Sequence, residues 1–150
     1  MRLTAVILSL VLITTTAQAD PKKWEACTKG TGQAAVEACT VLIAEPSLEK
    51  EDRSLALLSR GATYYNMGEY RKSIADLTRA IELYPDNPRS WKTRGKAYVR
   101  IGERAKAIAD LRKSLSLPLM ATGDFEEQRN DAELWLIIAE ATAAMPSASK

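Results

Sequence analysis

Apolar and polar positions follow helical spacing along most of this chain, and one stretch of the pattern is written twice. Arg94 follows Arg60 by 34 residues, and from each arginine onward apolar residues recur at intervals typical of one face of a helix. Identical residues at matching positions of the two copies include Arg60/Arg94, Gly61/Gly95, Tyr64/Tyr98, Gly68/Gly102, Ile74/Ile108, Asp76/Asp110, Leu77/Leu111 and Leu83/Leu117. A period of 34 residues is that of two helices joined by a turn. We therefore predict two repeats, at residues 54–87 and 88–119.

Residues 20–46 predict a degenerate copy of the same helical hairpin. Gly30-Thr31-Gly32 is a turn signal, and aligning it with the glycines of the regular repeats places Cys39 where Leu77 stands. The connection to the next repeat, around residues 47–53, is longer than in the regular period.

Residues 124–145 predict a single helix that covers the end of the array. Trp135 and Ala139 have the spacing of Trp91 and Gly95, so this segment resembles the first helix of a repeat without its second helix. A helical array needs such an atypical terminal helix, because its last apolar face would otherwise be exposed to water.

Residues 1–19 are typical of a secretory signal peptide. Arg2 provides a positive start, residues 3–13 form an apolar run, and Ala17-Gln18-Ala19 is a small-residue cleavage site, so we expect a cut after Ala19. The apolar run is shorter than the roughly 20 residues that a membrane span requires. The mature chain is thus expected in the periplasm or secreted, with no membrane span, and residues 146–150 are expected to form a flexible tail.

Composition excludes several functions. The 150 residues have room for one domain, and the absence of histidine removes the commonest general base and transition-metal ligand. The formal charge of +2, which becomes +1 without Arg2, is too small to imply nucleic acid. The sequence has no nucleophile motif, phosphate loop or metal-ligand cluster. We expect no enzymatic activity, no cofactor and no metal.

The two cysteines, Cys27 and Cys39, fall on the two predicted helices of the first hairpin. An even number of cysteines in an exported chain favours a disulfide, and closing so short a loop is worth about 2–3 kcal/mol in the chain-entropy model. The alternative is a pair of buried free thiols. Since redox-active pairs are usually closer, as in Cys-x-x-Cys, we predict a structural disulfide in the weakest repeat.

The two regular repeats resemble the tetratricopeptide repeat in Trp91, Gly95, Tyr98, Ala107 and Leu111, and in Ala80 and Pro85 of the preceding unit. The resemblance is strong from residue 54 to about residue 119 and weaker over residues 24–46. It implies an all-α fold, a right-handed α-solenoid of antiparallel helix pairs with about seven helices. It also implies that the concave face formed by the first helices binds a peptide or another protein.

The first helices of the two repeats differ along the side that this resemblance places on the concave face. One row is largely apolar and the other is basic, and the predicted peptide-binding residues are Leu55, Leu58, Ala62, Tyr65, Asn66, Arg89, Lys92, Lys96 and Arg100. The four cations of the second row share one helix stripe, because they are three or four residues apart. Such a stripe beside apolar and aromatic side chains suits an extended peptide with an acidic group or a free C-terminal carboxylate. The family's clamp for such carboxylates is not carried over, because Ala62 and Lys96 replace its asparagine.

Two other interpretations of the basic stripe stay open. Charged runs are usually the solvated side of an amphipathic helix. The second interpretation is that the stripe is neutralised within the protein. In that case Glu133 and Glu140 of the last helix lie opposite Arg89 and Lys96.

An arginine and an aspartate recur inside both repeats at the same separation. Asp76 follows Arg60 by sixteen residues, as Asp110 follows Arg94, whereas the family commonly has an apolar residue at the arginine position. We predict that each arginine pairs with an aspartate on a packed helix, within its repeat or in the adjoining one, and that these ion pairs are structural.

Together these features predict an exported interaction module with a protein or peptide partner, acidic in character. Leu58 and Tyr65 are expected to give apolar contacts, and Lys92, Lys96 and Arg100 to attract carboxylates. The alternatives are an oligomer that assembles through the end faces of the short array, and a soluble subunit of a cell-envelope complex that uses its convex side.

Overall fold

The computed structural model describes residues 20–118 and 125–144; the predicted signal peptide and the predicted tail lie outside them. Within the described residues the chain forms seven α-helices and no strand. The helices are α1 (Pro21–Lys29), α2 (Gly32–Ala44), α3 (Lys50–Asn66), α4 (Tyr70–Leu83), α5 (Pro88–Arg100), α6 (Arg104–Ser116) and α7 (Phe125–Ala144). The predicted all-α fold class is confirmed.

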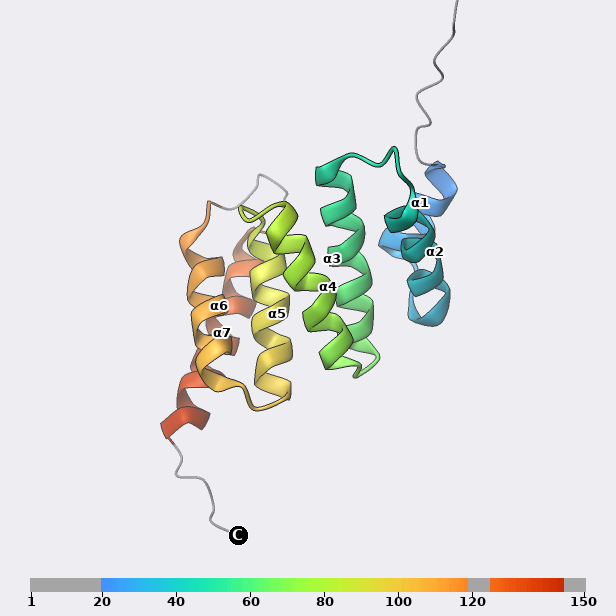
Figure 1. The fold of residues 1–150 in the computed structure, drawn as a ribbon. Coiled ribbons are helices and arrows are strands. Elements are labelled where there is room, and N and C mark those ends of the chain that lie inside the picture. Colours follow the sequence, from blue (N-terminus) through green and yellow to red (C-terminus); the bar gives the residue numbers. More distant parts are fainter. Residues whose placement is uncertain (1–19, 119–124, 145–150) are drawn as a thin grey trace, which may run out of the picture.

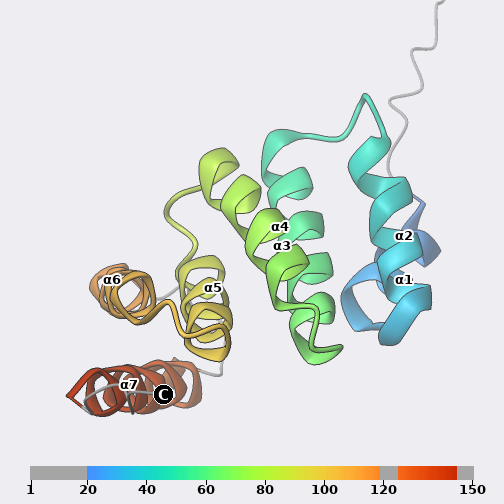
Figure 2. The same cartoon turned by 60° about the horizontal axis from the view of Figure 1, so that its bottom comes forward.

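The helices are stacked in antiparallel pairs, α1 with α2, α3 with α4 and α5 with α6, and α7 closes the array (Figure 1). Each second helix also packs against the first helix of the next unit. The first helices α1, α3, α5 and α7 contact one another in turn, whereas α2, α4 and α6 do not. Seen from another side, α5 lies next to both α6 and α7 (Figure 2). The closer spacing of the first helices puts them on the inner, concave side.

Glycines bring the paired helices of each repeat together. A Cβ on Gly61 would lie 2.8 Å from Cγ of Leu77, and a Cβ on Gly95 would lie 2.8 Å from Cγ of Leu111. Both leucines are fully buried. Gly68 ends α3 with a φ of +80°, which residues other than glycine rarely adopt. Residues shared by the two copies therefore set the distance and the turn between their helices.

The link between the N-terminal hairpin (α1 and α2) and α3 is shorter than the sequence predicts, because α3 begins at Lys50. Glu51 and Asp52 occupy its first turn, where carboxylates interact favourably with the helix dipole. Arg53 points back to α2, and its guanidinium donates hydrogen bonds to the carbonyl oxygens of Ile43 (2.7 Å), Glu45 (2.8 Å) and Leu48 (3.1 Å). Arg53 thus supplies a partner for a carbonyl of the last turn of α2, at Ile43, and ties the link between α2 and α3 to the start of α3.

Cys27 of α1 and Cys39 of α2 form a disulfide, with Cα atoms 4.7 Å apart, which confirms the predicted pairing. Both cysteines are buried in one hydrophobic cluster with Leu42 of α2 and with Leu57 and Leu58 of α3. The disulfide therefore joins α1 and α2 inside the core that they share with α3.

Two buried serines, Ser73 of α4 and Ser90 of α5, have hydroxyls with no hydrogen-bond partner among the described residues. The matching residues of the other repeat are Ala107 and Ala56, which have no hydroxyl. Ser114 is buried as well, but its hydroxyl donates a hydrogen bond of 2.8 Å to the carbonyl oxygen of Pro88.

We predict that Ser73→Ala will stabilise the fold by about 1 kcal/mol, because a buried hydroxyl without a partner costs about 1–3 kcal/mol. Urea unfolding of the mature chain measures the change. The matched control is Ser114→Ala, which removes a hydroxyl that has a partner and should lower stability. Equal losses in the two variants would contradict the prediction.

Candidate functional site

Most of the predicted binding residues meet on the concave side, where α3, α5 and α7 run beside one another. A shallow hollow of about 170 Å³, here called the concave hollow, is lined by Ala62, Tyr65, Asn66, Arg89, Lys92, Thr93, Lys96 and Asp131. Arg100 adjoins it, since its Nε donates a hydrogen bond of 3.3 Å to Oη of Tyr65. The structure therefore brings the basic stripe (Arg89, Lys92, Lys96 and Arg100) and the Tyr65 end of α3 into one surface.

The two leucines of the predicted apolar row lie outside this hollow. Leu58 is only 3% exposed, in the cluster that contains Cys27 and Cys39, and Leu55 packs partly buried against the same cluster. The N-terminal hairpin takes up this part of α3, so Leu58 belongs to the core. The prediction that Leu58 contacts a ligand is therefore wrong.

Aromatic rings supply the apolar part of the surface in place of the leucines. Nζ of Lys96 lies 5.6 Å from the ring centre of Tyr65 and 5.2 Å from that of Trp135, so it is placed against both rings. The guanidinium carbon of Arg100 is 5.2 Å from the Trp135 ring centre. The ring of Tyr70, 5.5 Å from that of Tyr65, extends the aromatic surface. Contacts of cations with ring faces stabilise this arrangement by roughly 0.5–2 kcal/mol each.

Asp131 of α7 holds the two central lysines of the basic stripe. Its Oδ2 lies 3.2 Å from Nζ of Lys92 and 3.2 Å from Nζ of Lys96. Burial raises the pKa of Asp131, but the hydrogen bonds and charges of the two lysines outweigh burial and keep its pKa below the ordinary value. The carboxylate is therefore ionised at neutral pH and neutralises part of the stripe.

The acidic residues that the sequence suggested as partners of the stripe face other groups. Glu133 accepts a hydrogen bond of 2.9 Å from Arg129 of its own helix, and Glu140 accepts one of 2.9 Å from Arg112 of α6. The predicted pairing of Glu133 and Glu140 with the stripe is therefore wrong, although a carboxylate of the same helix does pair with it.

Glu133 and Glu140 do not reach the stripe because α7 packs in a different register from the one that the sequence alignment gave. The first helices α3, α5 and α7 each bury two small residues seven positions apart, which are Ala56 and Thr63 on α3, Ser90 and Ala97 on α5, and Ala132 and Ala139 on α7. Ala132 thus stands in the place of Ser90, and Asp131 in the place of Arg89. The alignment of Trp135 with Trp91 is wrong by two residues, because small buried side chains decide how α7 packs.

The recurring arginines and aspartates form bidentate ion pairs within each repeat. Nε and Nη2 of Arg60 lie 2.7 and 2.8 Å from the carboxylate of Asp76, and those of Arg94 lie 2.7 and 2.9 Å from that of Asp110. The remaining Nη1 donates to a threonine of the preceding second helix, Thr40 (2.8 Å) or Thr78 (3.0 Å). The pairs link neighbouring units, and none of their residues lines the concave hollow; the predicted pairing is present, and its structural role stays a prediction.

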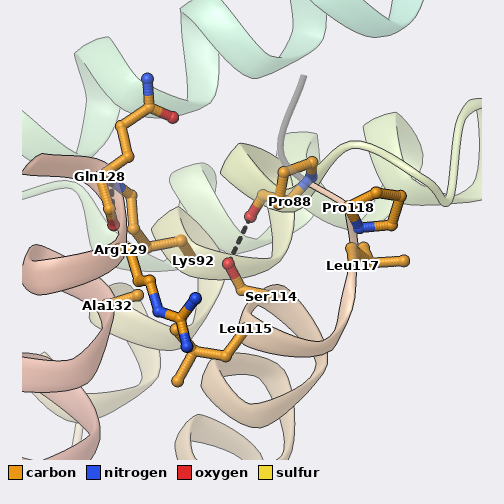
Figure 3. Close-up of a pocket in the computed structure, with 9 residues that line it drawn as sticks. All are labelled: Pro88, Lys92, Ser114, Leu115, Leu117, Pro118, Gln128, Arg129 and Ala132. Carbon is orange, nitrogen blue, oxygen red and sulfur yellow. Dashed lines mark hydrogen bonds between the residues drawn. The ribbon is translucent and has the colours of Figure 1, made fainter. Parts of the chain in front are cut away.

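A second cavity, of about 220 Å³, lies where α5, α6 and α7 meet (Figure 3). It is lined by Pro88, Lys92, Ser114, Leu115, Leu117, Pro118, Gln128, Arg129 and Ala132, and two of these residues are joined by the hydrogen bond that Ser114 donates to Pro88. Lys92 lines this cavity as well as the concave hollow. The Lys92 side chain is therefore a wall that the two spaces share.

The described part of the chain has no group of three or more histidine, cysteine, aspartate or glutamate residues placed to hold a metal ion. None of the helices in that part is long and apolar enough to cross a bilayer.

Helix pairs in a short stack, with a charged concave side made by the first helices, define an α-solenoid of the protein-interaction class. Models of the tetratricopeptide repeat match residues 54–87 and 88–118. Residues 54–118 of the chain therefore consist of two tetratricopeptide repeats.

Two solved structures are similar to this chain in fold. The type III secretion translocator chaperone SycD of Yersinia enterocolitica has a TM-score of 0.69 and 20% sequence identity, over 83% of each chain. The first tetratricopeptide-repeat domain of Spaghetti (RPAP3), bound to the HSP90 peptide SRMEEVD, has a TM-score of 0.66 and 15% identity, over 83% of this chain and 90% of that one. No curated protein sequence matches the chain significantly. At these identities the two structures establish the fold alone.

Proposed function

We propose that this protein is an exported adaptor that binds an acidic segment of a partner protein on the concave face of α3, α5 and α7. The observation that carries the proposal is the basic stripe of α5, which lies beside the rings of Tyr65 and Trp135. Cations paired with aromatic faces hold the carboxylates and the apolar parts of a peptide at the same time.

The two arginines of the stripe are the cations most open to a ligand. Arg89 and Arg100 are exposed, whereas Lys92 and Lys96 are only partly exposed and face Asp131. The two arginines are eleven positions apart on α5, which is about 16 Å along the helix, a distance that an extended peptide covers with about five residues. We therefore favour a ligand with acidic groups about five residues apart and a middle part that lies along Tyr65.

Export is part of the proposal and rests on two features. Residues 1–19 have the pattern of a cleavable signal peptide. The disulfide between Cys27 and Cys39 suits an oxidising compartment, because such bonds persist in the periplasm and outside the cell. The Spaghetti domain, which is similar in fold, is bound to the peptide SRMEEVD, and two glutamates and an aspartate make that peptide acidic.

A self-assembling role has one observation in its favour, the exposed leucine and isoleucine on the outer side of α7. Leu134 is 55% and Ile137 is 63% exposed. By the register of α7, however, Ile137 stands where Gly61 and Gly95 admit a closely packed second helix. A further helix therefore cannot approach α7 as closely as α4 approaches α3, and we rank self-assembly second. Light scattering of the mature chain distinguishes an oligomer from a monomeric adaptor.

Reversal of the two open arginines tests the proposal. We expect the Arg89→Glu/Arg100→Glu variant to lose the partners that the wild-type chain captures from a periplasmic extract, with affinity reduced by about 100-fold or more. This variant leaves the bridge between Asp131 and the two lysines intact.

The matched control is Arg79→Glu/Lys113→Glu, which makes the same change of charge at exposed positions of α4 and α6. The control should capture the same partners as the wild type. If the concave variant keeps its partners and the convex control loses them, the binding face has been assigned to the wrong side.

A further inference from the structure

One carboxylate of the chain already sits in the middle of the basic stripe. We propose that Asp131 is an internal stand-in for a ligand carboxylate: it fills the site between Lys92 and Lys96, and an acidic side chain of the partner has to replace it there. This inference rests on the proposed function and adds to it the residue that decides which ligands bind.

The geometry around Asp131 is that of a bound anion. Lys96 donates to both carboxylate oxygens, at 3.3 Å and 3.2 Å, and Lys92 reaches the same Oδ2 at 3.2 Å. The side chain of Asp131 is 32% exposed, against 14% for Lys92 and 21% for Lys96. The carboxylate is thus the most exposed member of the group, so a ligand can reach its place without opening the core.

Apolar contacts attach α7 to the array alongside this bridge. Ala132 and Ala139 are buried, and Ala139 lies in a cluster with Ala107 and Leu111 of α6, against which Leu136 also packs. α7 thus packs through buried small residues, as α3 and α5 do.

The preceding interface between first helices has no such bridge. By the repeat alignment, the positions of Lys92 and Lys96 are held on α3 by Leu58 and Ala62, which carry no charge. The position of Asp131 is held on α5 by Arg89, so the carboxylate is peculiar to α7. A contact that only fastened one first helix to the next would not need an ion pair, since α3 and α5 pack against each other without one in the described part of the chain.

The exchange makes the groove selective for acidic ligands. A carboxylate that enters between the two lysines restores the charge-assisted hydrogen bonds that Asp131 gives up. A neutral side chain cannot restore them and leaves Asp131 in place. The same groove without Asp131 would bind carboxylates more tightly, because nothing would have to be displaced.

The test compares Asp131→Asn with Glu133→Gln, which removes the same charge two residues along α7 from a side chain that pairs with Arg129. The probes are two fluorescein-labelled nine-residue peptides, one of alternating alanine and glutamate and one of alternating alanine and glutamine. We expect Asp131→Asn to bind the glutamate peptide about five- to tenfold more tightly than the wild type, in the range of a partly buried ion pair. Glu133→Gln should bind it like the wild type, and the glutamine peptide should bind weakly to all three.

Each other outcome is decisive. If the wild type binds the glutamate peptide and Asp131→Asn binds it equally or less well, Asp131 only fastens α7 and the inference is wrong. If Glu133→Gln tightens binding as much as Asp131→Asn, the effect is one of overall charge and the inference is again wrong. If neither the wild type nor Asp131→Asn binds the peptide while circular dichroism shows both folded, the proposed function itself fails.

Discussion

Asp76→Ala will lower the free energy of unfolding by about 3–5 kcal/mol, because it leaves a buried guanidinium without its carboxylate. The side chains of Arg60 and Asp76 are only 13% and 8% exposed, and their two hydrogen bonds measure 2.7 and 2.8 Å. The hydrogen bonds that Arg60 donates to Asp76 raise the pKa of Arg60 further above its already high ordinary value, so the arginine cannot lose its charge to escape the penalty.

Chemical unfolding of the mature chain measures this loss, and Glu82→Ala is the matched control. Glu82 is an exposed acidic residue on the same helix, so its removal should change stability by less than about 0.5 kcal/mol. A second variant, Arg60→Met/Asp76→Leu, should recover most of the loss, since replacing both partners by apolar residues removes the unpaired charge. If Asp76→Ala is as stable as the control, the pair is not structural.

Loss of the disulfide should cost about 3 kcal/mol, as the chain-entropy model gives for a loop of about a dozen residues. The bond joins α2 to α1, which has nine residues and buries no residue other than Cys27. Cys27→Ala/Cys39→Ala should therefore unfold at lower urea concentration than the wild type, and its N-terminal amides should lose protection from hydrogen exchange first.

The wild type in reducing buffer should match the double variant, and the double variant itself should not respond to the reductant. Protection of α5 and α6 should change little, because these helices do not touch the N-terminal hairpin. If reduction leaves both the unfolding midpoint and the exchange of α1 and α2 unchanged, the hairpin is held by its apolar contacts alone.

Features that repeat in the sequence could be predicted, because each one is stated twice. The period of 34 residues predicts the helix pairs, and the pairing of Arg60 with Asp76 recurs in Arg94 and Asp110. Gly61 and Gly95 are shared because each faces a leucine of its second helix. With two cysteines in the sequence there is one possible pairing. Predicting it required only that the two residues lie on the two helices of one hairpin.

Features at the two ends of the array could not be predicted in the same way, because they have no second copy. The burial of Leu58 depends on where the N-terminal hairpin packs, which the spacing within α3 does not reveal. The register of α7 depends on two buried alanines, whereas the sequence alignment followed the more conspicuous Trp135. A shift of two residues moved Glu133 and Glu140 away from the stripe and placed Asp131 against it. The small-residue spacing shared with Ser90 and Ala97 was the signal that would have found the correct register.

The most direct test of the concave-face proposal is a titration of the ¹⁵N-labelled mature chain with the alternating alanine–glutamate peptide, followed by amide and side-chain chemical shifts. We predict that the changes gather on α3, α5 and α7, above all at Tyr65, at the stripe residues Arg89 and Arg100, and at the indole of Trp135. Changes confined to the exposed cations of α4 and α6, such as Arg79 and Lys113, would contradict the account, and so would a spectrum that the peptide leaves unchanged.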